Sequence, residues 1–302
     1  MLRTSLLSVL IVLVGAASAV AAVPSSPTLA ETLARAKALH VGAEAKAVRR
    51  SFLRGARLIA GGDGAALGRT RLGGRPDLQG GAKWPTCGGR PLSFLAQIDL
   101  SELNAAVPGA TRGRGLLSVF ADLREDADGV PPIEEFYGRL RAKACGVAIR
   151  RSSGSRAGLR RLAATPRAVH TLRATPVRLR PTLTVPNWSA IDAVLGHRLS
   201  QTQSDRWATF ADEASYGILG RRPPIAPVHQ LLGWSTPIQD DPTYGCGGET
   251  TKVPSRRLLL QLDFDPALRF AIGDGGGLYL TITPRDLHAG RFDRLCAEFQ
   301  EG

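Results

Sequence analysis

The pattern of apolar and polar positions changes near residue 70 of this chain. Before it, apolar residues recur at helical spacing, and Thr28 and Glu31 stand three apart, as in a helix capping box. The pattern predicts one or two helices from about 28 to 55, ending near Gly61-Gly62. After it, glycine and proline interrupt short apolar runs, which is typical of β-rich structure.

The apolar runs after residue 70 predict several short strands and a few peripheral helices. "SAIDAVLG" (189–196) and "QSDRWATFADEAS" (203–215) have helical patterns, and a short helical turn is expected at 286–292. Residues 152–165 are rich in serine, glycine and arginine and predict a mobile loop. The candidate strands are 92–98, 115–121, 145–150, 168–173, 257–263, 268–272 and 277–283.

One strand pattern occurs twice. "PLSFLAQIDL" (91–100) and "RRLLLQLDFD" (256–265) both end an apolar run on Gln-x-Asp. Downstream, Gly115 and Gly277 each open another apolar run, and upstream "LGGRPDLQ" (72–79) resembles "LGWSTPIQ" (232–239). The fold class expected is therefore α+β: β-rich, with two related β-sheet units from an internal duplication. The alternative is that apolar strands ending in polar residues resemble one another by chance.

The polar residues Gln97, Asp99, Gln261 and Asp263 follow from that pattern as site candidates. With a side-chain period of two, Leu92, Phe94, Ala96 and Ile98 share one face, and Leu258, Leu260 and Leu262 share the corresponding face. The opposite faces turn polar toward the strand ends. These residues either line a shared pocket or serve structure, with Gln binding backbone and Asp capping a turn or helix. We favour the structural role, and "DLSELNAA" makes Asp99 a candidate helix cap.

A second set of polar residues carries the enzyme hypothesis. His229 stands beside Gln230 and shortly before Gln239, and with Asp263 or Asp274 as carboxylate partner it is the candidate acid/base of a hydrolase. A structural, hydrogen-bonded histidine is the alternative. "AIGDGGGLYLTI" lacks a phosphate-loop pattern and predicts a hairpin turn at Asp274-Gly275. No motif predicts a cofactor or a metal site.

The first residues predict export. Arg3, an apolar run over 6–14 and small residues around Ala17-Ser18-Ala19 form the pattern of a secretory signal peptide over 1–22. An uncleaved N-terminal anchor is the alternative; no transmembrane helix is expected after cleavage. A secreted or extracytoplasmic chain allows disulfides, for which the candidates are Cys87, Cys145, Cys246 and Cys296. Three pairings are open, and buried free thiols are the alternative.

Charge is concentrated in one segment. The chain of 302 residues has a formal charge of +13, and residues 136–191 hold twelve Arg or Lys and no Asp or Glu. Arg150, Arg151, Arg160 and Arg161 are the candidate contacts for an anionic surface or polymer. The segment has no aromatic residue between Tyr137 and Trp188, so it carries no specific nucleic-acid signal. A solvated basic face without a partner is the alternative.

The order of these blocks resembles a known family. "GGRPDLQGGAKWP", "PLSFLAQIDL", "HQLLGWSTPIQDD", "RRLLLQLDFD" and "AIGDGGGLYLTITPRDL" are similar to the YwqG-like family, also called DUF1963. The resemblance implies a mixed, β-dominated fold over 70–302, after a helical segment at 23–69. It implies no established activity and provides no catalytic residues. Many relatives are intracellular, so the signal peptide is a departure.

Two function hypotheses follow. The first is an exported, non-enzymatic binding module whose basic surface contacts an anionic partner or another protein. The second is a hydrolase-like enzyme with a pocket between the two β-rich repeats. They differ in whether the polar residues converge on an open cavity.

Overall fold

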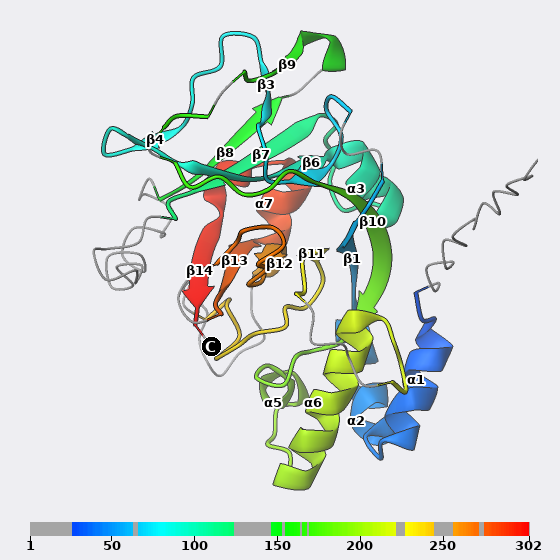
Figure 1. Ribbon diagram of the computed structural model, residues 1–302. Coiled ribbons are helices and arrows are strands. Elements are labelled where there is room, and N and C mark those ends of the chain that lie inside the picture. Colours follow the sequence, from blue (N-terminus) through cyan, green and yellow to red (C-terminus); the bar gives the residue numbers. More distant parts are fainter. Residues whose placement is uncertain are drawn as a thin grey trace, which may run out of the picture.

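A ten-stranded antiparallel sheet forms the body of the protein (Figure 1). The computed structural model describes residues 26–62, 66–123, 146–152, 155–163, 165–167, 169–221, 227–244, 256–271 and 275–301. The expected signal peptide lies outside these residues. The strand order is β14-β13-β12-β11-β1-β10-β2-β6-β7-β8, so the chain forms one continuous sheet rather than two separate β-sheet units.

The sheet has a central pair of strands with a four-strand meander on each side. β1 (Leu53–Ala60) pairs with β10 (Thr175–Thr184) along its whole length. Meander A comprises β2 (Arg71–Leu72), β6 (Ser93–Asp99), β7 (Leu116–Ala121) and β8 (Val147–Ser152), and begins beside β10. Meander B comprises β11 (Gln230–Leu232), β12 (Arg257–Leu262), β13 (Gly277–Ile282) and β14 (Cys296–Gln300), and begins beside β1.

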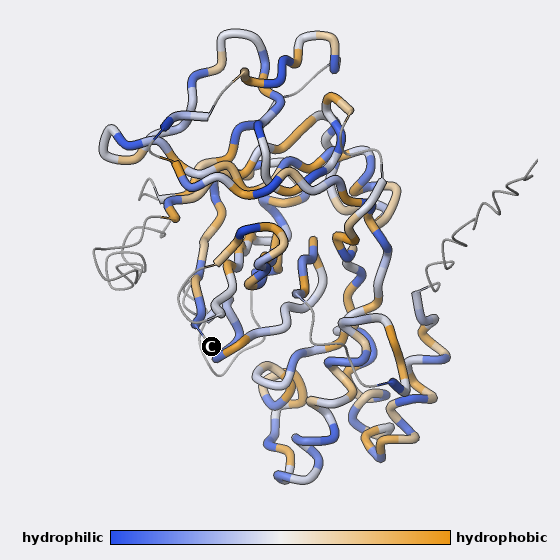
Figure 2. Tube along the Cα trace, in the orientation of Figure 1, coloured by the Kyte–Doolittle hydropathy of each residue, from blue (hydrophilic) through white to orange (hydrophobic). Residues whose placement is uncertain are grey.

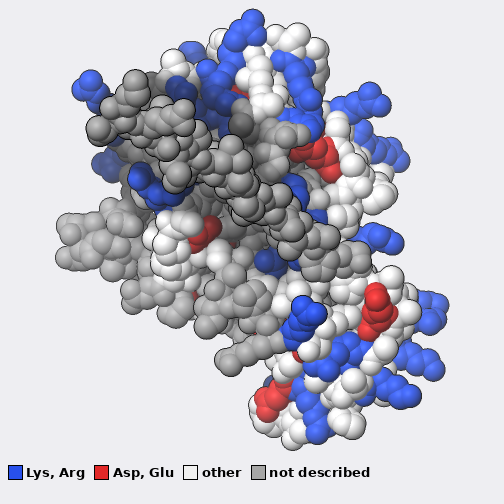
Figure 3. Space-filling model, turned by 45° about the vertical axis from the view of Figure 1, so that its right-hand side comes forward, with Lys and Arg blue, Asp and Glu red and all other residues white. Residues whose placement is uncertain are grey.

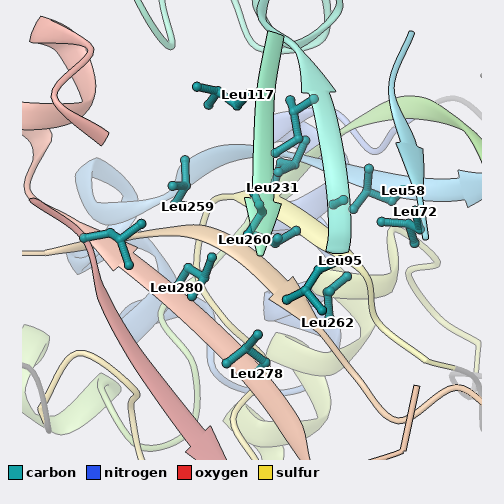
Figure 4. Packing of buried hydrophobic residues seen from close by; sticks show 14 of the residues in the cluster. Leu58, Leu72, Leu95, Leu117, Leu231, Leu259, Leu260, Leu262, Leu278 and Leu280 are labelled. Atoms are coloured by element: carbon teal, nitrogen blue, oxygen red, sulfur yellow. The ribbon is translucent and has the colours of Figure 1, made fainter. Parts of the chain in front are cut away.

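The main core lies where the inner faces of the two meanders meet. The sheet curls into a near-barrel, so that leucines of meander A, including Leu95 and Leu117, join one cluster with Leu259, Leu260 and Leu280 of meander B. Figure 4 shows these side chains pointing toward one another, and Figure 2 shows apolar and polar positions interspersed along the strands of the sheet. Burial of this shared apolar face is the main stabilising contribution to the fold.

A β-bulge changes the face assignment expected for the two Gln-x-Asp strands. The β6–β7 register shifts between Phe94 and Ala96, and the β12–β13 register shifts between Leu258 and Leu260. One extra residue in each strand reverses the alternation. Phe94 therefore packs in a smaller cluster, away from Ala96 and Ile98, which lie in the main core. The prediction of one continuous apolar face for each strand was wrong for this reason.

Helices form a second packed region beside β1 and β10. α1 (Leu29–Ala38) begins with the predicted capping box of Thr28 and Glu31, and α2 (Gly42–Ala47) and the 3₁₀ turn η1 (Arg49–Ser51) follow. α5 (Ile191–Leu195) and α6 (Gln201–Tyr216) pack against them, with Trp207 and Phe210 fully buried. Among the described residues, no helix has the length and apolar character needed to cross a membrane.

The remaining short elements surround meander A and the C-terminus. β3 (Asp77–Gln79) pairs with β9 (Leu159–Arg161), which follows η2 (Arg156–Gly158), and β4 (Thr86–Cys87) pairs with β5 (Arg90–Pro91). The stretch 152–165, expected to be a mobile loop, thus contributes the strand β9, which lies in the upper part of Figure 1. α3 (Leu100–Ala106) follows β6, and α7 (Pro284–Ala289) with η3 (Phe292–Arg294) connects β13 to β14.

Three predicted segments differ from the structure. Residues 53–60, expected at the end of a helix, form β1 at the centre of the sheet. The strand expected at 168–173 forms instead at 175–184. Residues 268–272 contribute only an isolated bridge between Asp265 and Phe270. β1 and β10 contain arginines among their apolar residues, and two of these, Arg57 and Arg180, are bound by the C-terminal end of α6.

Candidate functional site

Gln97, at the end of β6, is completely buried and bound on all sides by protein. Its side-chain carbonyl accepts a hydrogen bond from the backbone N–H of Asp77 at 3.0 Å. Its amide nitrogen donates to the backbone carbonyl of Arg69 at 2.7 Å and to the Asp77 carboxylate at 2.9 Å. Gln97 therefore fastens the chain around β2 and β3 to β6 and presents no group to a ligand.

Asp77 is the centre of a buried ionic cluster that the sequence did not indicate. Its carboxylate accepts hydrogen bonds from Arg71 at 2.9 Å, from Arg161 at 2.8 Å and from the backbone N–H of Gly68 at 2.8 Å. Burial alone would raise the pKa of this carboxyl, but these donors outweigh it and hold the pKa well below its usual range. The cluster connects the basic segment, through Arg161, to meander A.

Asp99 has the capping role expected from the sequence. Its Oδ1 accepts a hydrogen bond from the backbone N–H of Ser101 at 2.8 Å, at the start of α3. Its second oxygen pairs with Arg156. Its own backbone N–H donates to the Thr70 hydroxyl at 3.0 Å. Both carboxylate oxygens are thus engaged within the protein.

Gln261, on β12, repeats the role of Gln97. Its side-chain carbonyl accepts from the backbone N–H of Thr236 at 3.0 Å, and its amide nitrogen donates to the Thr236 hydroxyl at 2.5 Å. The amide also donates to Asp263 at 2.7 Å. Gln97, Asp99, Gln261 and Asp263 therefore hold their own surroundings rather than converging on a shared open pocket.

His229 and Asp263 lie within hydrogen-bond reach, but not as a catalytic pair. The Asp263 carboxylate accepts from the backbone N–H of Val228 at 2.7 Å, and its own backbone N–H donates to His229 Nδ1 at 3.3 Å. His229 Nε2 lies 3.0 Å from the Asp265 carboxylate. Since Nδ1 accepts, we assign the proton to Nε2, which donates to Asp265.

Burial shifts the pKa values of both His229 and Asp263. It lowers the pKa of His229, which favours the neutral imidazole, and it raises the pKa of Asp263. With both ring nitrogens engaged by Asp263 and Asp265, the imidazole has no free nitrogen for a substrate proton, which a general base requires.

The same contacts recur at corresponding positions of the two meanders. Arg71 stands opposite Gln97 in its ladder, as Gln230 stands opposite Gln261. Six residues beyond each ladder partner, Asp77 and Thr236 donate their backbone N–H to the respective glutamine. By these contacts Arg71 corresponds to Gln230, and therefore Leu72 corresponds to Leu231. The sequence alignment of the upstream blocks matched Leu72 with Leu232, so the two alignments differ by one position.

Backbone conformation and the preceding side chain follow the same correspondence. Gly73 and Gly74 have φ of 59° and 76°, and Leu232 and Gly233 have φ of 58° and 79°. A left-handed conformation is rare for leucine, so its recurrence at the position of a glycine marks a constrained turn. One residue before each ladder partner, Thr70 and His229 each bind the backbone N–H of the aspartate in Gln-x-Asp.

A family model for a domain of unknown function, DUF1963, matches residues 70–300, which contain both Gln-x-Asp blocks. The chain belongs to the DUF1963 family. A comparison with curated proteins finds no match. The DUF1963 match begins after β1, although β1 is the central strand of the sheet.

The other candidate pocket residues of this DUF1963 protein are Gln230, Gln239 and Asp274. The Gln230 amide donates to the backbone carbonyls of Leu232 and Trp234, at 2.8 Å each. Gln239 is exposed, and its backbone N–H donates to Gln300 at 3.1 Å. Asp274 lies outside the described residues.

The four candidate polyanion-binding arginines do not form one surface. Arg161 is bound to Asp77, and Arg160 donates to the backbone carbonyls of Ala157 and Leu159. Arg150 and Arg151 are exposed neighbours on the edge strand β8, so their side chains point to opposite faces of the sheet. Their contact with an anionic partner stays a prediction.

The two cysteines in the described residues, Cys87 and Cys296, are disulfide-bonded, and neither is a free thiol. Cys145 and Cys246 lie outside the described residues. The pairing of the four cysteines stays a prediction.

Arg57, on β1, is a buried charge that sequence reasoning missed because its strand was assigned to a helix. It donates to the backbone carbonyl of Ser215 at 3.2 Å, and its guanidinium lies 4.9 Å from the centre of the Tyr216 ring. Burial lowers its pKa to about 10. These contacts join the central strands to α6 and give Arg57 a structural role.

A long groove runs along the exposed side of β10, and we call it the β10 groove. It consists of two hollows of about 400 and 460 Å³ that share Pro181. Arg69 and Arg178 line the first hollow, and Arg49 and Arg54 line the second. Figure 3 shows Lys and Arg side chains projecting along this side of the molecule.

The β10 groove has a strong excess of positive charge. Glu102 is the only acidic residue among its described lining residues, and it pairs with Arg69 at 2.9 Å. The side chains of Arg54 and Arg178 are exposed, and neither side chain forms a hydrogen bond or ion pair with a described residue. The floor between them is apolar and includes Leu179, Pro181 and Leu183.

Proposed function

We propose that this DUF1963 protein is an exported, non-enzymatic binding module, and that its partner is an extended anionic polymer bound in the β10 groove. One observation carries the proposal. The groove has four arginine side chains along its length and a single carboxylate, which is already paired. Such a surface attracts polyanions over a distance set by ionic strength.

The length of the groove favours a polymer over a small ligand. The two hollows follow one another along β10, with Arg178 in one and Arg54 in the other. Arg54, opposite Leu183, and Arg178 project from opposite faces of the sheet. An extended chain of repeating negative charges that crosses the edge of β10 reaches both arginines, whereas a small anion contacts one. The apolar floor at Pro181 and Leu183 complements the uncharged parts of such a chain.

We also infer that the two meanders arose from an internal duplication. The support is the set of paired contacts: a bulge two residues before each glutamine, a ladder partner opposite it, and a backbone N–H bound six residues beyond that partner. Chance resemblance of two apolar strands does not account for contacts made by other segments. The duplicated residues form scaffold in this proposal, and binding belongs to the surface of the central pair.

Export is proposed from the N-terminal pattern of a signal peptide alone. It predicts that the mature protein begins after residue 22 and meets anionic polymers outside the cytoplasm. N-terminal sequencing of protein recovered from the exported fraction tests this point, and an intact Met1 would contradict it.

The binding proposal is tested by retention on an immobilised polyanion. Heparin-agarose serves as the probe, and the salt concentration at elution is the measured quantity. The double variant Arg54→Gln/Arg178→Gln removes two groove charges. The matched control, Arg198→Gln/Arg206→Gln, removes two exposed charges near α5 and α6.

We expect the groove variant to elute at clearly lower salt than both the control variant and the wild type. Equal shifts for the two double variants would mean that binding follows net charge and not the groove. Retention of the wild type that does not change with salt would refute electrostatic binding altogether.

A further inference from the structure

A small polar pocket lies beside Asp99, separate from the lining of the β10 groove. Its walls come from the end of β6, the loop before β7, the end of β8, and the η2–β9 segment. Its volume is about 170 Å³, and its described lining includes Arg114, Arg156, Ser101 and Ser152. We call it the Arg114 pocket.

The charges around the Arg114 pocket do not balance. Asp99 is the only acidic residue among the described lining residues, and its two oxygens already accept from the backbone N–H of Ser101 and from Arg156. Arg114 is exposed and forms no hydrogen bond or ion pair with a described residue. One full positive charge therefore faces the pocket without a compensating group in its described lining.

The donors in the pocket match the acceptors of an oxyanion. A guanidinium presents five N–H donors, and the bond to Asp99 leaves further donors on Arg156 available. The lining also contains the hydroxyls of Ser101 and Ser152. Guanidinium and hydroxyl groups around a small cavity favour carboxylate or phosphate oxygens, because charge-assisted hydrogen bonds are the stronger ones.

The corresponding place in meander B is occupied by larger side chains. Thr70 corresponds to His229, because each binds the backbone N–H of the aspartate in its Gln-x-Asp strand. Ser101 corresponds to Asp265, because each lies two residues after that aspartate. His229 and Asp265 meet at 3.0 Å. Meander A has two short hydroxyl side chains at these positions, and the Arg114 pocket lies next to them.

We propose that the Arg114 pocket binds a small oxyanion of phosphate or carboxylate type, held by Arg114 and Arg156 with the hydroxyls of Ser101 and Ser152. This site is distinct from the β10 groove, because none of its lining residues belongs to the lining of the groove. Its size restricts the ligand to a small ion or to one charged end of a larger molecule.

The test measures binding by calorimetry and by the thermal unfolding midpoint, Tm. Inorganic phosphate and acetate are the two probes, each compared with chloride at equal ionic strength. The variant Arg114→Gln removes the unpaired charge. The matched control is Arg112→Gln, an exposed arginine in the same loop that does not line the pocket.

We expect one of the two anions to bind the wild type and to raise its Tm, since a ligand that binds only the folded state stabilises it. The control Arg112→Gln should behave like the wild type, and Arg114→Gln should bind at least roughly tenfold more weakly, the effect of losing a charge-assisted hydrogen bond. Binding of phosphate alone or acetate alone distinguishes the two chemistries.

Two results would overturn the proposal. One is that neither anion binds the wild type more than chloride does. The other is that Arg114→Gln and Arg112→Gln bind the anion equally well, which would place it elsewhere. The variant Ser152→Ala gives a second measure, because it removes a pocket hydroxyl without changing charge and should also weaken binding.

Discussion

Gln97 and Gln261 have the same position in the two meanders, yet truncating them should cost different amounts of stability. In the variant Gln97→Ala, two backbone groups lose the partner described for them: the buried N–H of Asp77 and the partly buried carbonyl of Arg69. In Gln261→Ala, the N–H of Thr236 is the one backbone group left without the partner described for it, while the Thr236 hydroxyl and the Asp263 carboxylate each lose a donor. The Thr236 carbonyl keeps a hydrogen bond from the Tyr279 hydroxyl at 3.1 Å.

The expected loss of stability follows from the number of backbone groups that are left without a hydrogen-bond partner. A buried polar group without a partner costs about 1–3 kcal/mol. Gln97→Ala should therefore lower the free energy of unfolding by about 2–6 kcal/mol, and Gln261→Ala by about 1–3 kcal/mol. Both variants remove the same side-chain atoms from buried sites, so the cavity contribution is similar and the difference reports the hydrogen bonds.

Urea unfolding followed by tryptophan fluorescence measures these free energies. Gln201→Ala, at an exposed position on α6, is the control and should change stability by no more than about 0.5 kcal/mol. If Gln97→Ala costs no more than Gln201→Ala, the buried amide does not hold β2 and β3 to β6. If Gln261→Ala costs clearly more than Gln97→Ala, counting orphaned groups is the wrong explanation.

Three further predictions concern the buried ionic groups and the cysteines. Asp77→Asn should cost about 3–5 kcal/mol at neutral pH, because it leaves Arg71 without its buried counter-charge. Since the folded state depresses the pKa of Asp77, its contribution to stability is fully present above the unfolded pKa of about 3.9 and is lost progressively as the pH falls from there through the folded pKa. Urea unfolding at pH 7 and pH 3 should show the first part of this loss, and an equal loss in Asp77→Asn would assign it to another group. Nitrogen NMR should find His229 neutral at pH 6.5 with the proton on Nε2, and a proton on Nδ1 would contradict the bond from Asp263. Non-reducing peptide mapping should recover Cys87 and Cys296 only in disulfide-linked peptides, because neither is a free thiol; an alkylated free thiol at either position would contradict this.

Elements with a strong local signal could be predicted from the sequence. The capping box at Thr28 and the aspartate cap at Asp99 are side chains that bind their own neighbours, so the pattern contains both partners. The same holds for α6, whose predicted span of 203–215 lies within Gln201–Tyr216. β6, β7, β12 and β13 have apolar runs of the right length between turn residues, which suffices to identify a buried strand.

The central strands could not be predicted because their partners are distant in sequence. β1 and β10 contain arginines among their apolar residues, and Arg57 and Arg180 find their partner in Tyr216 of α6, which is distant in sequence. β2 and β11 have two and three residues, too few for any periodicity. The bulges at Leu95 and Leu259 have no local signature, and each reverses which residues face the core.

The Gln-x-Asp pattern could be located in the sequence, but its role could not be determined from the sequence alone. The favoured structural role is the one that the contacts of Gln97 and Asp99 describe, yet the main partner of Gln97 is Asp77, twenty residues away. The two meanders share the Gln-x-Asp pattern and differ in the residues around it. Thr70 and Ser101 in meander A correspond to His229 and Asp265 in meander B. Residues that make the same contacts in both meanders hold the strands together, whereas a ligand site can arise where the two meanders differ. The search for function in this family is therefore directed to the side chains beside the two Gln-x-Asp strands rather than to the shared contacts.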